Sequence, residues 1–60
     1  MNTLDYQIAA LRKDVKRYSR LAAVKHPKDP AVKASNVEML RLTRAALDGL
    51  EQRKREEARP

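Results

Sequence analysis

The sequence has no cysteine, tryptophan or phenylalanine, and only one glycine and one histidine. The lack of cysteine excludes disulfides and thiolate metal sites and is consistent with a reducing compartment, so we expect a cytoplasmic protein. A single glycine excludes the glycine-rich loops that hold phosphates. The longest aliphatic runs are only a few residues long, which predicts neither a signal peptide nor a membrane span.

The chain is equally poor in groups that could support catalysis. His26 lies between a lysine and a proline, a setting typical of a surface turn rather than of a general base or a metal ligand. The carboxylates Glu38, Asp48 and Glu51 are dispersed on the polar side of a helical segment, so they form no inward-facing acid pair. We therefore predict no enzymatic activity, no cofactor, no metal site and no small-molecule substrate.

What the chain does contain is one helical pattern repeated on either side of residues 26–30, His-Pro-Lys-Asp-Pro. The pattern predicts an all-α hairpin in a single domain, 1–60. Its parts are a first helix over about 3–25, a turn at 26–29, a second helix over about 30–55 and a frayed charged tail at 56–60.

The predicted helix ends follow from local chemistry. Asn2 can cap the first helix and Asp5 places negative charge near its positive end. Pro27 disfavours helical geometry at the residue before it and so ends that helix. Asp29 can cap the second helix, and Pro30 suits its first position because no N–H is needed there. The short connection favours antiparallel helices.

Apolar residues recur at intervals of three and four in both helical segments, so each helix has an apolar stripe. The second stripe spans roughly 160°, more than one neighbouring helix can cover. We therefore predict a homo-oligomer, most simply a dimer of hairpins that forms a four-helix bundle. The residues predicted to form the core or oligomer contact are Leu4, Ile8, Leu11, Val15, Tyr18, Val32, Met39, Leu40, Leu42, Ala46, Leu47 and Leu50.

Two polar residues, Asn36 and Thr43, interrupt the second stripe. One interpretation is that they fix the register or the oligomeric state by requiring a specific hydrogen-bond partner. The other, which we favour, is that they occupy a wet edge of the bundle.

Positive charge is concentrated in one part of the chain. Residues 12–28 carry seven basic side chains against Asp14 alone, which gives +6 and equals the net charge of the whole sequence. The basic residues on the first helix point away from its apolar stripe and form a ridge. The candidate nucleic-acid contacts are Arg12, Lys13, Lys16, Arg17, Arg20, Lys25 and Lys28.

Two interpretations of this ridge stay open. It can be a solvated face that keeps a small protein soluble, the commoner role of such a surface. It can also bind nucleic acid, and then through the phosphate backbone, because no asparagine, glutamine or interleaved aromatic residue is present to read or stack bases. An acidic membrane surface is a poorer match because bulky aromatic anchors are lacking.

Tyr6, Leu21 and Val24 lie off the first stripe and are candidates for docking a protein partner. The sequence therefore predicts a non-enzymatic, oligomeric helical hairpin that acts as a protein-interaction or assembly module, with binding to an RNA or DNA backbone as the alternative. In size and layout the chain resembles the Rop family of small plasmid proteins, which dimerise as helical hairpins and bind RNA. The resemblance covers topology only, so no site residue is transferred.

Overall fold

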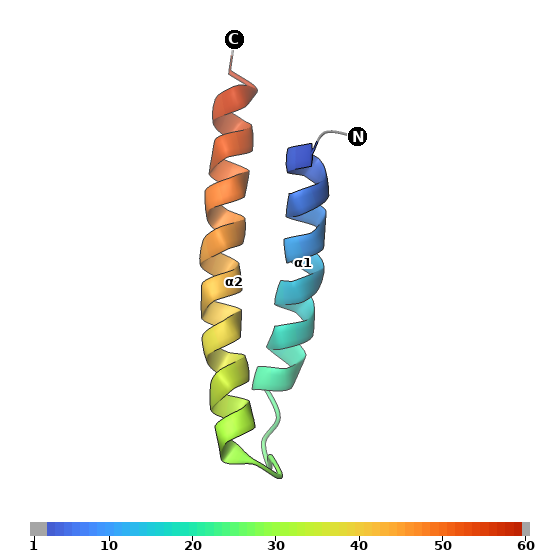
Figure 1. The fold of residues 1–60 in the computed structure, drawn as a ribbon, viewed down its shortest axis with the longest axis vertical. Helices are drawn as coiled ribbons and strands as arrows, with labels where there is room; N and C mark the ends of the chain where they lie inside the picture. Colours follow the sequence, from blue (N-terminus) through green and yellow to red (C-terminus); the bar gives the residue numbers. More distant parts are fainter. Residues whose placement is uncertain (1–2, 60) are drawn as a thin grey trace.

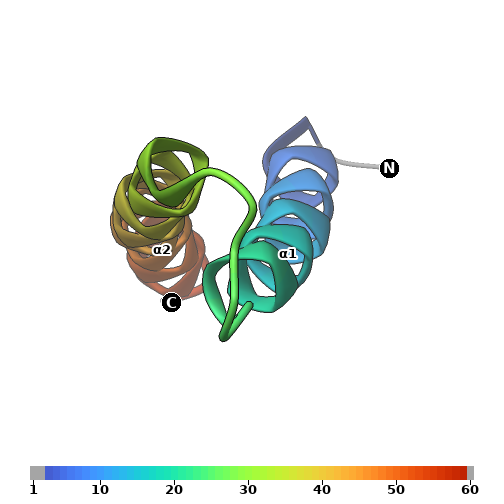
Figure 2. The same ribbon diagram turned by 90° about the horizontal axis from the view of Figure 1, so that it is seen from below.

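The structure is a computed structural model that describes residues 3–59. Two helices, α1 (Thr3–Ala22) and α2 (Pro30–Glu57), run antiparallel and pack against each other (Figure 1). Seen from the turn end, they lie side by side in a single layer, with the connecting segment crossing in front of their near ends (Figure 2). The predicted all-α hairpin is confirmed. The proposed N-cap, Asn2, lies outside the described residues.

Helix α1 ends three residues earlier than predicted, at Ala22. The amide of Ala23 still donates to the carbonyls of Ser19, at 3.2 Å, and Arg20, at 3.3 Å, and the chain then leaves helical geometry. Pro27 has no N–H with which to continue the ladder, and it disfavours helical geometry at the residue before it. The connection is therefore longer than the predicted turn, and Lys25 belongs to it rather than to the carbonyl end of α1.

Helix α2 begins where the sequence predicts. Asp29 is extended, with φ −130° and ψ 106°, and its side chain accepts a hydrogen bond of 2.9 Å from the amide of Ala31. Pro30 takes the first helical position, where a donor is not needed. The helix continues to Glu57, two residues past the predicted end, and an ion pair of 3.5 Å between Arg53 and Glu57 spans its last turn.

The contact between the helices holds little fully buried apolar surface. Within residues 3–59, only two hydrophobic side chains are buried, Leu4 at 8% exposed and Ile8 at 3%. The other apolar residues of the interhelical contact are half-buried: Leu11, Val15 and Tyr18 on α1, and Leu40, Leu47 and Leu50 on α2. A single hairpin therefore shields its own apolar stripes only in part.

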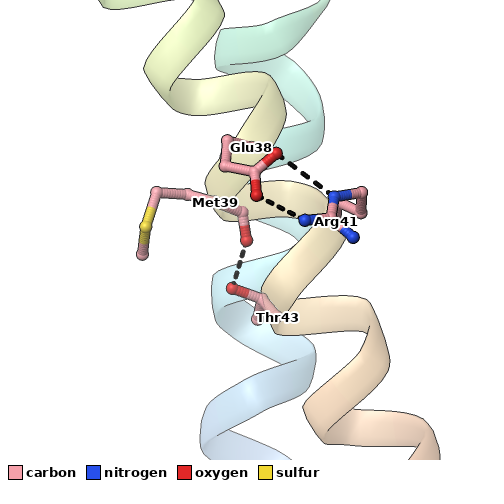
Figure 3. Close-up of polar contacts among 4 residues, drawn as sticks. All are labelled: Glu38, Met39, Arg41 and Thr43. Atoms are coloured by element: carbon pink, nitrogen blue, oxygen red, sulfur yellow. Dashed lines mark hydrogen bonds and ion pairs between the residues drawn. The ribbon is translucent and has the colours of Figure 1, made fainter.

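Thr43 lies in this contact and is only 8% exposed, so the interpretation of a wet edge is wrong at this position. Its hydroxyl donates to the carbonyl oxygen of Met39, one turn back in the same helix, at 2.6 Å (Figure 3). Because that bond satisfies the hydroxyl within α2, the side chain can be buried without a partner on α1. Asn36, one turn nearer the connection than Leu40, is half-buried.

Candidate functional site

Helix α2 is rotated so that only part of its broad apolar stripe meets α1. The line of Leu40 and Leu47, together with Thr43, is turned toward α1. A second line, in which Val32, Met39 and Ala46 follow each other at seven-residue intervals, is turned to one side, since seven residues make almost two full turns. All three side chains of this second line are exposed.

The exposed line continues into a larger apolar surface that includes residues of both helices. A groove on this side is lined by Ala10 and Leu11 of α1 and by Ala46 and Leu50 of α2, with Tyr6 and Gln7 at its edge. A second groove, at the turn end, brings Leu21 beside Val32. We call this surface the apolar face and define it by the following residues: Ala10, Leu11, Leu21, Val32, Met39, Leu42, Ala46 and Leu50.

The opposite side of the hairpin is polar. Arg12 Nη2 lies 2.8 Å from Glu51 Oε2, and Lys54 Nζ lies 2.6 Å from Asp5 Oδ1, so two ion pairs join α1 to α2. All four side chains keep substantial exposure to solvent. Contacts between such distant sequence positions are not signalled by the sequence. The spacing of Glu51 from Arg55 instead suggests a pair within α2.

All seven predicted nucleic-acid contacts are exposed. Five lie on α1, whereas Lys25 and Lys28 belong to the connection. Arg12 is held by its ion pair with Glu51. The Arg17 guanidinium stays close to its neighbour Tyr18, with a hydrogen bond of 3.0 Å to the phenolic oxygen and its central carbon 4.8 Å from the ring centroid.

The remaining three cations on α1, like Arg17, have no acidic partner among the described residues. Within residues 3–59, Lys13, Lys16 and Arg20 take part in no ion pair. They lie on the outer side of α1, away from Leu4 and Ile8. We call these three residues together with Arg17 the basic ridge.

The structure separates the residues predicted to dock a protein partner. Tyr6 is 68% exposed and lies near the open end of the hairpin, beside Ala10. Leu21 and Val24, about 40% exposed, line the groove at the turn end with Pro27. Tyr6 therefore lines a different groove from Leu21 and Val24.

A separate ion pair on α2, between Glu38 and Arg41, shifts the pKa of both side chains. Arg41 Nη2 donates to Glu38 Oε1 at 2.5 Å, and Arg41 Nε donates to the other carboxylate oxygen at 3.2 Å (Figure 3). The hydrogen bond from Arg41, with its positive charge, lowers the pKa of Glu38, and the same bond raises the pKa of Arg41. Both side chains are more than half exposed.

Within residues 3–59, no three histidine or acidic side chains gather where they could hold a metal ion. Neither α1 nor α2 has the combination of length and apolar character needed to cross a membrane. Comparison with protein-family models, with curated proteins and with solved structures gives no match to this chain.

Proposed function

We propose that this protein is a self-associating interaction module, in which two hairpins pack their apolar faces together to form a four-helix bundle. The observation that supports it is the imbalance of apolar burial within one chain. Leu4 and Ile8 are the only buried hydrophobic residues among those described, whereas Val32, Met39 and Leu42 are 56%, 39% and 50% exposed. A second copy would remove this surface from water, at about 25 cal/mol per Å² of apolar area.

One broad side of the hairpin has room for a dimer contact. The Cα atoms extend over 50 × 18 × 13 Å, so the outline of the broad side in Figure 1 is about 50 Å by 18 Å. A standard protein interface takes about 800 Å² from each partner. That area is roughly a sixth of the 5028 Å² exposed by the chain, so one broad side is enough to supply it.

The small side chains within the apolar face support close packing. Ala10 and Ala46 line the groove between the helices on this side, and neither would hold a neighbouring helix away. An identical face on a second hairpin could therefore insert larger side chains, such as Leu42 or Met39, over these positions. A self-complementary contact of this kind closes with two-fold symmetry and gives a dimer rather than an open chain.

The test compares two matched substitutions on opposite flanks of α2. Leu42→Lys places a charge on the apolar face, whereas Val37→Lys places it at a residue of nearly equal exposure, 48% against 50%. The two positions are five residues apart, about 140° of helical rotation. In light scattering after size exclusion, the native chain and Val37→Lys should have twice the 6.9 kDa chain mass, and Leu42→Lys should shift to the monomer.

Circular dichroism accompanies this experiment, because a dimer must melt at a temperature that rises with chain concentration. The native chain should show this dependence between about 5 and 200 µM, and Leu42→Lys should lose most of it. A native chain that is monomeric and melts cooperatively at one temperature throughout this range would overturn the proposal. Equal loss of the dimer in both variants would show that the apolar face is not the contact.

A further inference from the structure

We propose that the basic ridge, Lys13, Lys16, Arg17 and Arg20, binds the phosphate backbone of duplex nucleic acid. The proposal starts from the distribution of charge. The net charge of +6 arises entirely within residues 12–28, and the structure exposes every basic residue of that segment. The ridge therefore concentrates positive charge on one side of α1 and does not merely reflect a basic composition.

The acidic residues that pair across the hairpin do not cancel the charge of the ridge. Glu51, across the hairpin, is already paired with Arg12, and Asp5 is already paired with Lys54. The only acid within residues 12–28, Asp14, lines a groove with Lys13 but takes part in no ion pair within residues 3–59. Four ridge cations thus face one acid, and the ridge keeps a net positive field that attracts anions.

The spacing of the ridge matches an extended polyanion. Side chains three or four residues apart on a helix have Cβ atoms about 5–6 Å apart, so residues 13–20 form a row of charges about 10 Å long. Duplex nucleic acid carries about one negative charge per 1.7 Å of its axis, and several phosphates face such a row at once. Each phosphate contact releases condensed counterions, which favours binding at low salt.

The chemistry of the ridge also defines what it recognises. Lysine and arginine side chains hydrogen-bond phosphate oxygens, whereas sequence readout in the major groove relies mainly on paired donors and acceptors that reach base edges. The guanidinium of Arg17 is held beside Tyr18 but keeps further N–H groups that can donate to a phosphate oxygen. The ridge therefore binds duplexes with little dependence on their sequence.

This site can be separated from the proposed dimer by substitution. All four ridge residues belong to one helix of one chain. Lys16 and Arg20, the two residues changed in the test below, lie on the outer side of α1, whereas Lys13 borders the apolar face in a groove with Ala10. Leu42→Lys and Val37→Lys add the same charge but differ in their expected oligomeric state. The two variants should therefore show the same salt dependence of duplex binding per chain, although one is expected to be a monomer and the other a dimer.

The test measures binding of a fluorescein-labelled RNA or DNA duplex of about 20 base pairs by fluorescence anisotropy between about 50 and 200 mM KCl. With four phosphate contacts, the logarithm of the binding constant should fall with the logarithm of salt at a slope of about −3.6 per chain. Lys16→Gln/Arg20→Gln should reduce that slope by about 1.8 and weaken binding at least tenfold at the lowest salt.

The control removes the same charge from α2. Arg41→Gln/Arg53→Gln also lowers the net charge by two, at exposed positions off the ridge, and it should change the slope by less than about 0.5. Circular dichroism confirms that each variant keeps its helices. Three results would overturn the proposal: no duplex binding at the lowest salt, equal losses in both double variants, or binding to anionic phospholipid vesicles without binding to duplexes.

Discussion

Replacement of Thr43 by valine should make the protein more stable. Thr43 is buried against α1, and its hydroxyl donates to the carbonyl of Met39 at 2.6 Å (Figure 3). That carbonyl is also the regular helical acceptor for the amide of Thr43 itself. Removal of the hydroxyl therefore leaves no buried group without a hydrogen-bond partner. Valine keeps the branched shape and has a similar helix propensity.

The expected size of the effect follows from two opposing contributions. Loss of the hydroxyl removes a hydrogen bond worth about 0.5–1.5 kcal/mol net. It also removes the cost of burying a hydroxyl, about 1–3 kcal/mol on scales derived from proteins, and adds a buried methyl group. The balance is a gain of about 1 kcal/mol in the free energy of unfolding per chain. For a domain of this size, such a gain raises the melting temperature by about 4–8 °C.

Urea and thermal unfolding, followed by circular dichroism at one fixed chain concentration, measure this gain. Thr43→Ser is the matched control because it keeps the hydroxyl and deletes the buried methyl, at a cost of about 1 kcal/mol. If Thr43→Val instead lost stability or changed the oligomeric mass, the hydroxyl would have a partner outside its own helix. Thr43 would then fix the register or the oligomeric state of the bundle through that partner.

Three further substitutions test contacts seen in the hairpin. Asp29→Ala removes the cap of α2 and should cost about 1 kcal/mol in urea unfolding, whereas Asp29→Asn should cost much less. Glu51→Gln breaks the ion pair with Arg12 and should cost no more than about 1 kcal/mol, with the loss shrinking in 1 M salt because the pair is exposed. Arg41→Gln should return the pKa of Glu38 to its ordinary value, as followed by NMR titration of the carboxyl carbon. Since the pairing lowers that pKa, it stabilises α2 above pH 4.5 and its contribution disappears as the pH falls through the lowered value.

The sequence predicts those features that depend on neighbouring residues. The start of α2 is an example, because the cap by Asp29 and the fit of Pro30 are fixed by chemistry within a few residues. The end of α1 is harder, because Pro27 indicates that the helix must stop but not how many residues the chain needs to reverse direction. The connection includes three residues, 23–25, that the position of Pro27 predicts to be helical.

The rotation of α2 about its own axis could not be predicted from its sequence. The apolar stripe is wider than one helical neighbour, so several orientations bury similar apolar area. In the structure, the line of Leu40 and Leu47 meets α1, and Met39 and Val32 are left at the side. The ion pair between Arg12 and Glu51 depends on the same rotation. Local pattern thus gives the elements, whereas packing between them decides which residues share a face.

This rotation also explains why one hairpin can support two different contacts. It directs the unused part of the α2 stripe to one side, where it joins Leu11 and Ala10 in the apolar face. On the other side, Glu51 is drawn toward Arg12, and Asp5 is paired with Lys54. The basic ridge consequently keeps a net positive charge, and a second hairpin on the apolar face would leave Lys16 and Arg20 open to solvent. Self-association and phosphate binding would then use different surfaces of the same two helices, so each can be removed by substitution without the other.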